Sequence, residues 1–210
     1  MVIKVLNLYA GIGGNRKLWS DDIEVTAIEI NEDIANIYKG FFPNDKVIVT
    51  DAHKYLLEHF EEFDFIWSSP PCQSHSRMNR ILFAQERTKE NARRYPDMQL
   101  YQEIIFLKHY FKGKWVVENV IPYYEPLIKP QKANRHYFWS NFHITDNPAV
   151  PNTLNINSGK RDIGLDISNK KCSLRKDVVM HNCVEPELGL HVFNCAFKTT
   201  QTSLKEIGDK

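Results

Sequence analysis

Short apolar runs alternate with amphipathic segments from residue 3 to residue 120, and this alternation limits the fold more than any other feature. Five runs are predicted to be strands, at residues 3–9, 24–30, 46–50, 63–67 and 114–120. Segments with helical spacing lie between them, at residues 15–19, 31–42, 53–60 and 98–111. Regular alternation of this kind predicts an α/β fold with a mostly parallel sheet flanked by helices.

The pattern is looser beyond residue 120. Residues 135–142 and 189–197 are both predicted to be strands, and the span between them is rich in Asn, Lys, Pro and Ser, as in an insertion. We therefore divide the chain into a main domain at 1–144, a small insertion at 145–188, and a C-terminal strand and tail at 189–210. The strand and tail are expected to pack on the main domain.

Composition limits the class of protein. The 210 residues are 42% hydrophobic and 25% charged, which suits one compact domain. No segment reaches the roughly 20 apolar residues of a membrane helix, so we expect a cytoplasmic protein with no membrane partner. The four cysteines lack the C-x₂-C pair of a zinc site, so we expect no metal. With a net charge of +1, nucleic-acid binding would depend on local basic clusters.

Chemically suggestive residues lie where each predicted strand ends. They are Tyr9 to Gly14 after the first strand, Glu29 and Ile30 in the second, Asp51 and Ala52 after the third, Pro70 to Cys72 after the fourth, and Glu118 and Asn119 in the fifth. Ligands of open parallel sheets bind at the carboxyl ends of strands, so these residues are expected to meet in one cleft. The run "GIGGNR" lacks the last glycine of a dinucleotide fingerprint, and no phosphate loop is present. An adenosine-type ligand such as S-adenosylmethionine remains.

The motifs "NLYAGIGGNRKLW", "AIEIN", "TDA", "SSPPCQS" and "VVENV" occur in this order and resemble those of the cytosine-5 methyltransferases that act on DNA, with a close branch acting on transfer RNA. The resemblance covers residues 2–120. It implies a class I methyltransferase (Rossmann-like) fold and S-adenosylmethionine as the methyl donor. The cofactor-binding residues that it implies are Tyr9, Ala10, Gly11, Ile12, Gly13, Gly14, Glu29, Ile30, Asp51, Ala52 and Pro70. Glu29 would hold the ribose, Ile30 would pack on the adenine and Asp51 would bind its amino group.

The same resemblance assigns the chemistry. Carbon 5 of cytosine is a poor nucleophile, so the family first adds a cysteine thiolate to carbon 6, and Cys72 matches that cysteine. The prolines before it fix its backbone. Glu118 would share a proton with the ring, and Asn119 would position Glu118 or the cysteine loop. Arg135 in "ANRHYF" is the one match to the family's arginine element, with His136 in the place of a spacer.

Substrate contacts are expected in the loop after Cys72. The candidate residues are Gln73, Ser74, Arg77 and Arg80. In this family the loop closes over a cytosine flipped out of the duplex, and arginines there would meet phosphates. We therefore expect DNA as the partner, with a second copy or a partner protein supplying specificity because the insertion is short. No glycine-asparagine motif that would close the cofactor site was found near the C-terminus.

Several alternatives remain open on sequence alone. Cys72 could be a buried structural cysteine, Glu29 and Asp51 could be capping or surface carboxylates, and the basic residues could form a solvated surface. The same chemistry could act on RNA or on a free cytosine nucleotide. The chain could also be a catalytically weak protein that binds nucleic acid or cofactor.

Overall fold

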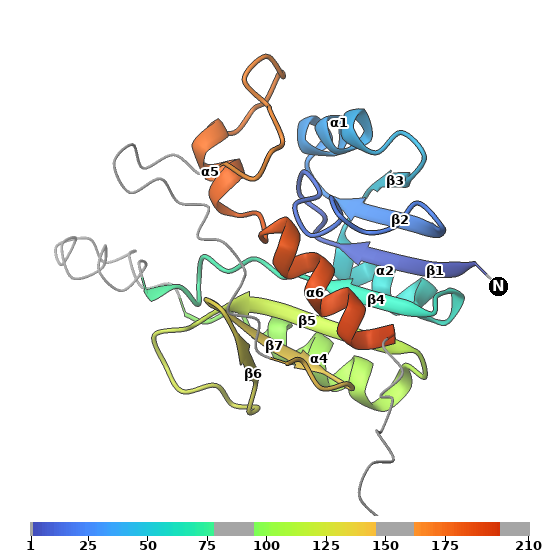
Figure 1. The fold of residues 1–210 in the computed structure, drawn as a ribbon. Helices are drawn as coiled ribbons and strands as arrows, with labels where there is room; N and C mark the ends of the chain where they lie inside the picture. The colour runs from blue at the N-terminus through green and yellow to red at the C-terminus, as the bar shows by residue number, and fades with distance from the viewer. Residues whose placement is uncertain (1, 78–94, 146–161, 198–210) are drawn as a thin grey trace, which may run out of the picture.

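The computed structural model describes residues 2–77, 95–145 and 162–197, which form a seven-stranded sheet with helices on both faces (Figure 1). The strand order is β3-β2-β1-β4-β5-β7-β6. The bounds are β1 (Ile3–Leu8), β2 (Ile23–Glu29), β3 (Lys46–Val49), β4 (Phe65–Ser68), β5 (Lys114–Val120), β6 (Gln131–Ala133) and β7 (His136–Ser140). Strands β1 to β5 pair in parallel, and β7 is antiparallel to both of its neighbours. The predicted α/β fold with a mostly parallel sheet, of the class I methyltransferase type, is confirmed.

The helices form two layers. Their bounds are α1 (Glu32–Phe41), α2 (Ala52–His59), α4 (Gln99–Tyr110), α5 (Lys176–His181) and α6 (Pro186–Phe197), with a short 3₁₀ helix η1 (Phe60–Glu62) after α2. In Figure 1, α6 crosses the front of the sheet, while α2 and α4 lie behind it. None of the helices in the described residues is both long and apolar enough to span a membrane.

Period-two alternation in the strands supplies both layers with apolar side chains. Leu6 and Leu8 of β1 point to one face and join the core under α2 and α4. Val5 points to the other face and joins Val192 and Phe193 of α6. Each side chain buried in this way stabilises the fold by roughly 1.5 to 3 kcal/mol. Strands that are apolar on both faces are therefore covered on both faces.

The prediction of a strand at residues 189–197 is wrong, because this segment lies in α6. Its buried residues recur every three or four positions, as in Leu188, Val192 and Ala196, which is a helical period. A nine-residue apolar run fits either element, so its length did not decide between them. Gly189 lets the helix approach the backbone of Asn15, because an added Cβ would clash there. The segment packs on the sheet as expected, and the tail at 198–210 lies outside the described residues.

The helix expected at residues 15–19 is also absent from the described structure, which forms turns there. Its backbone bonds span three residues, from Lys17 N–H to the Gly14 carbonyl and from Trp19 N–H to the Arg16 carbonyl. Asn15 is drawn to the end of β1 instead, where its amide donates to Asn7 Oδ1 over 2.9 Å. These local bonds compete with a helical ladder.

The described part of the predicted insertion packs close to the cleft end of the sheet. Ile163, Leu165 and Val179 pack against Ile34 and Ile37 of α1. Most of the long loop after Cys72, at residues 78–94, lies outside the described residues, as do residues 146–161. The division of the chain at residues 144 and 188 stays a prediction.

Candidate active site

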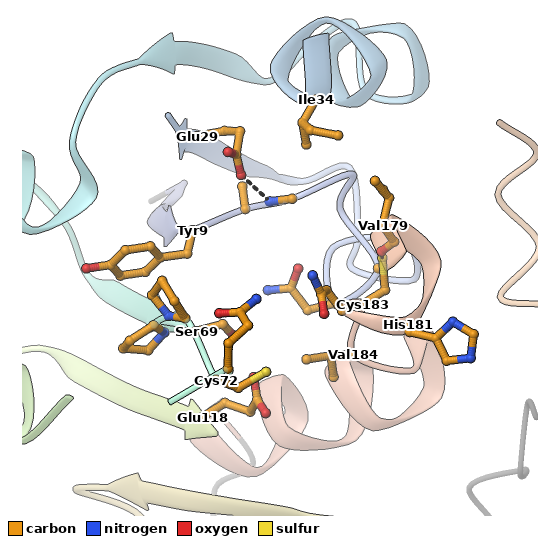
Figure 2. A pocket seen from close by; sticks show the side chains of 18 of the residues that line it. Tyr9, Glu29, Ile34, Ser69, Cys72, Glu118, Val179, His181, Cys183 and Val184 are labelled. Carbon is orange, nitrogen blue, oxygen red and sulfur yellow. Dashed lines mark hydrogen bonds between the residues drawn. The ribbon is translucent and has the colours of Figure 1, made fainter. Parts of the chain in front are cut away.

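The strand order reverses between β1 and β4, and a pocket of about 250 Å³ opens at the carboxyl ends of these strands. Such a switch point is where open α/β sheets bind ligands, because the loops on either side diverge. Figure 2 shows Glu29 on one side of the pocket, Cys72 and Glu118 on another, and Val179, Cys183 and Val184 facing them from α5 and the turn after it. Residues of the main domain and residues from Leu174 to Val184 thus line the same pocket.

The turn after β1 presents bare backbone to the pocket. Tyr9 and Gly11 both have φ of 55°, in the left-handed region. Nothing lies within 4 Å of the place where a Cβ on Gly11 would be, so the backbone there faces open space. Gly13 serves packing instead, because an added Cβ would clash with the ring of Phe42. A Cβ added to Gly14 would clash with the carbonyl of Val184, so only glycine allows this close approach.

Glu29 has a carboxylate fixed by two backbone donors. The Gly11 N–H donates to Oε2 over 3.0 Å, and the Asn31 N–H donates to Oε1 over 2.9 Å. Ile30 follows it in the sequence and is 68% exposed, Leu174 is 48% exposed, and both line the pocket. A fixed carboxylate next to exposed apolar side chains suits a ligand that carries both hydroxyls and a flat apolar ring.

Tyr9 forms an aromatic wall that is held from behind. Its hydroxyl donates to Glu103 Oε1 over 2.5 Å, and Glu103 is fully buried. Burial, together with the charge of Glu103, raises the pKa of Tyr9 far above its ordinary value, so the hydroxyl stays a donor. Ser68 donates to the other oxygen of Glu103 over 2.6 Å. The side chain of Tyr9 is therefore pinned to α4 and β4.

Cys72 lies in the loop after β4, and Glu118 projects from β5 into the same pocket. The Cys72 carbonyl accepts the N–H groups of His75 and Ser76, each over 3.0 Å, which turns the loop directly after the cysteine. Burial, and then the negative charge of Glu118, raise the pKa of the Cys72 thiol to about 11. In the protein without substrate the sulfur is therefore a thiol at neutral pH.

His136 bridges two acidic side chains at the edge of the pocket. Its Nδ1 lies 2.7 Å from Glu118 Oε1 and its Nε2 lies 3.3 Å from Glu185 Oε2. Burial would lower the pKa of His136, but the charges of the two carboxylates and the hydrogen bond to Glu118 raise it to about 9. His136, which was expected to replace a spacer, is thus charged and lies beside Glu118.

The pocket brings together ten of the predicted site residues. They are Tyr9, Ala10, Gly11, Gly14, Glu29, Ile30, Pro70, Cys72, Gln73 and Glu118. Asn119 lies behind the pocket wall, where its amide donates to the Pro70 carbonyl over 3.0 Å. Arg77 donates to the Pro122 carbonyl over 3.3 Å, and the Ser74 hydroxyl accepts from the Asp97 N–H over 3.0 Å.

Other predicted residues are not part of the pocket lining. Ile12 and Ala52 are buried in the core, and Asp51 is exposed, where it caps α2 by accepting from the Lys54 N–H over 2.7 Å. Arg135 is exposed on the turn between β6 and β7. Arg80 lies outside the described residues.

Sequence reasoning missed one wall of the pocket as well as His136. The missed residues of that wall are Leu174, Val179, His181, Asn182, Cys183 and Val184. They come from the segment around α5, where no site residue was expected. The other lining residues that were not predicted are Asn15, Asn31, Ile34, Ser69, Pro71 and Val120.

The strand order and the pocket at its switch point are of the class I methyltransferase type. The family model for "C-5 cytosine-specific DNA methylase" matches residues 3–122, more than half of the chain. The chain belongs to this family.

Curated relatives match a shorter part. The tRNA (cytosine(38)-C(5))-methyltransferase of Homo sapiens is 33% identical over 84 residues, which are 37% of this chain and 22% of the relative. The enzyme of the same name from Mus musculus is 35% identical over 82 residues, which are 36% of this chain and 20% of the relative. The chain thus spans about a fifth of the length of these relatives.

Solved structures were matched as well. A mutant of Spodoptera frugiperda DNMT2 is 26% identical with a TM-score of 0.38, and the match covers 56% of this chain and 35% of that chain. The Entamoeba histolytica methyltransferase EhMeth is 21% identical with a TM-score of 0.36, and the match covers 57% of this chain and 38% of that one.

S-adenosylmethionine is the cofactor of this family, and the pocket fits it. The open backbone at Gly11 admits a ligand closely, the fixed carboxylate of Glu29 suits a ribose diol, and exposed Ile30 suits the face of an adenine. When bound, S-adenosylmethionine supplies an electrophilic methyl group.

Proposed function

We propose that the chain transfers a methyl group from S-adenosylmethionine to carbon 5 of cytosine in DNA, through a covalent adduct on Cys72. One observation carries the proposal: Cys72 and Glu118 line the same pocket as Gly11, Glu29 and Ile30. A nucleophile, a proton-sharing carboxyl group and a cofactor-type subsite therefore share one cleft at the switch point of the sheet.

The cofactor half of the pocket is assigned to residues of β1, β2 and the α5 region. Glu29 would accept hydrogen bonds from the ribose hydroxyls, because each of its oxygens retains a free lone-pair direction after accepting one backbone bond. Ile30 and Leu174 would contact the adenine from the two walls. Tyr9 would close the end of the pocket near Cys72.

The other half carries the covalent chemistry. Cys72 Sγ would bond to carbon 6 of the cytosine while Glu118 gives a proton to ring nitrogen 3, so that charge does not build up on the ring. The electron pair then reaches carbon 5, which takes the methyl group. Loss of the proton from carbon 5 and departure of Cys72 complete the exchange.

Because the pKa of the Cys72 thiol is raised, we expect the base to bind before the thiolate forms. Burial and the charge of Glu118 keep the sulfur protonated before substrate binds. A cytosine that hydrogen-bonds to Glu118 would offset that negative charge and so favour the thiolate. Activation of the nucleophile would then follow binding of the base.

The base must leave a duplex to reach this pocket, because Cys72 and Glu118 lie below the surface of the sheet end. DNA as the substrate is supported by the family model, which describes DNA methylases. The insertion at 145–188 is short, and part of it, from Leu174 to Val184, contributes to the lining of the pocket. We therefore propose that a second copy or a partner protein supplies sequence specificity.

A structured RNA is the second candidate substrate. The matched curated relatives from Homo sapiens and Mus musculus are both named for cytosine 38 of tRNA. The same pocket chemistry would serve either polynucleotide, since both present the same cytosine ring.

Incubation with methyl-labelled S-adenosylmethionine and, separately, duplex DNA, tRNA or deoxycytidine monophosphate tests the proposal. We expect label in DNA with the wild type and none with Cys72→Ser. Label in tRNA alone would replace DNA by the second candidate, and label in the mononucleotide alone would remove both. Cofactor binding without label in any substrate would indicate a binding protein and contradict the proposed activity.

A further inference from the structure

His136 is placed beside Glu118 by the register of the sheet. Strand β7 runs antiparallel to β5, with Phe138 opposite Glu118 and His136 opposite Val120. Residues two apart on a strand point to the same face, so His136 lies diagonally across from Glu118 on that face. The resulting distance from His136 Nδ1 to Glu118 Oε1 is 2.7 Å.

Glu185 reaches the same imidazole from a distant part of the chain. It directly precedes α6, and its carbonyl accepts the Gly189 N–H over 2.9 Å, which fixes its backbone at the helix start. The side chains of Glu118 and Glu185 are both 8% exposed, and that of His136 is 13% exposed. Two buried carboxylates on either side of one ring require a positive charge between them.

Within the described residues, the acidic side chains at the imidazole of His136 come from two segments of the chain. Glu118 projects from β5 and Glu185 lies before α6, while the ring of Phe138 lies 6.2 Å away on β7 itself. The thiol of Cys72 is a further titratable group near Glu118, whose charge raises its pKa. With the carboxylates ionised and His136 protonated, the cluster carries one net negative charge and one mobile proton next to the proposed reaction site.

We propose that His136 is a positioning residue that orients Glu118 and supplies the proton that Glu118 passes to the cytosine ring, with Glu185 holding that proton on His136 until the base binds. This inference rests on the proposed function and assigns a source for its proton. Arg135, which was expected to take part in catalysis, is exposed, and the inference assigns the role at this edge of the pocket to its neighbour His136.

The proton steps balance over one turnover. As the bond from Cys72 Sγ to carbon 6 forms, the thiol proton leaves to solvent, the Nδ1 proton of His136 passes to Glu118, and a proton passes from Glu118 to ring nitrogen 3. When the bond from Sγ to carbon 6 breaks after methyl transfer, Cys72 departs as the thiolate and regains a proton from solvent. Nitrogen 3 returns its proton to Glu118, and Glu118 returns it to Nδ1 of His136. The proton from carbon 5 is lost separately.

The pH profile of single-turnover methyl transfer tests this role. The thiolate of Cys72 becomes more abundant as pH rises toward about 11, whereas charged His136 is lost above about 9. The wild-type rate should therefore rise with pH and level off near pH 9. His136→Gln keeps a donor but has no titrating proton, so its rate at neutral pH should fall by about 100-fold and rise with no break near pH 9.

Glu185→Gln is the second variant, because it weakens the hold on the proton without touching the pocket lining. Its break should move below pH 9, and the imidazole signal of His136 in an NMR titration should shift the same way. His109→Gln, on the exposed side of α4, is the matched control and should keep the wild-type break. Cofactor binding measured on each variant reports whether the fold is intact.

An active wild type whose break is unchanged in His136→Gln and Glu185→Gln would overturn the inference and leave the proposed function standing. A wild type that methylates none of the three substrates would overturn the proposed function, and the proton role with it. An NMR titration in which His136 loses its proton near the ordinary value of about 6.5 would contradict the role of Glu185 in either case.

Discussion

The side-chain amide of Asn119 donates a hydrogen bond to the Pro70 carbonyl over 3.0 Å, which ties the end of β5 to the loop that carries Cys72. Asn119 is only 1% exposed, and its Oδ1 accepts the Val120 N–H over 3.0 Å. The nucleophile loop and the strand of Glu118 are therefore held together from behind the pocket. Pro70 also has a fixed φ, so this bond helps to set the position of Cys72.

Replacing Asn119 by Asp should separate positioning from folding. The Asp keeps an acceptor for Val120 but loses the donor to Pro70, and it leaves a charge beside a carbonyl. We expect methyl transfer to fall at least about tenfold, and the free energy of unfolding to fall by about 1 to 3 kcal/mol. Cofactor affinity should change little, because Glu29 and Gly11 are not touched. Gln102→Ala, at an exposed position of α4, is the control and should leave both properties unchanged. If Asn119→Asp lost cofactor binding together with methyl transfer, a local positioning role would be contradicted.

Glu29→Gln tests the cofactor subsite. The amide can accept only through its single oxygen, so one of the two backbone N–H groups, of Gly11 or Asn31, would lose its partner. Charge-assisted bonds to ribose hydroxyls would weaken too, and we expect the Kd for S-adenosylmethionine to rise by about 10- to 100-fold. Calorimetry measures it directly. Glu32→Gln on the exposed first turn of α1 should bind as the wild type does, and an unchanged Kd in Glu29→Gln would remove Glu29 from the subsite.

Tyr9→Phe should cost stability. Its hydroxyl is one of the donors to fully buried Glu103, so removing it leaves a buried carboxylate short of a partner. The free energy of unfolding should fall by about 1 to 3 kcal/mol in urea denaturation. Tyr110→Phe, which removes an exposed hydroxyl from α4, should change it little. Equal effects of the two substitutions would show that the bond from Tyr9 to Glu103 does not stabilise the fold.

Stability should also depend on the protonation of His136. Its pKa is raised from 6.5 to about 9 in the folded chain, so the contribution is fully present below pH 6.5 and is lost as pH rises through about 9. At about 1.4 kcal/mol per pH unit this amounts to about 3 kcal/mol. The free energy of unfolding of the wild type should fall across this window relative to that of His136→Gln. Parallel pH profiles for the two proteins would contradict the charged bridge.

Local pattern was enough to predict the sheet. Apolar runs bounded by glycine, asparagine or aspartate marked β1 to β5, and Asn31 caps α1 as expected, with its Oδ1 accepting the Ile34 N–H over 3.1 Å. The rule that ligands meet at strand ends then placed Glu29, Cys72 and Glu118 in one pocket. These predictions succeeded because the signals lie within a few residues of one another.

Contacts between distant segments could not be predicted in this way. Residues 189–197 carry a period that suits a helix, but an apolar run of that length also suits a strand. Their burial against the sheet is a tertiary contact that the local pattern does not show. His136 and Glu185 are 49 residues apart in the sequence, and no local signal joins them. The contact between Val184 and Gly14 could not be predicted either. The carbonyl of Val184 fills the space beside Gly14, so this glycine is needed for packing.

Cys72 is proposed to be the nucleophile that forms a covalent bond to cytosine, and a trapped adduct tests this most directly. Duplex DNA with 5-fluorocytosine is mixed with the protein and S-adenosylmethionine, because fluorine at carbon 5 blocks the final elimination. The account predicts a denaturation-resistant adduct, located by mass spectrometry on the peptide that contains Cys72, and its absence in Cys72→Ser. An adduct that persists in Cys72→Ser, or that maps to Cys183 in the wild type, would contradict it.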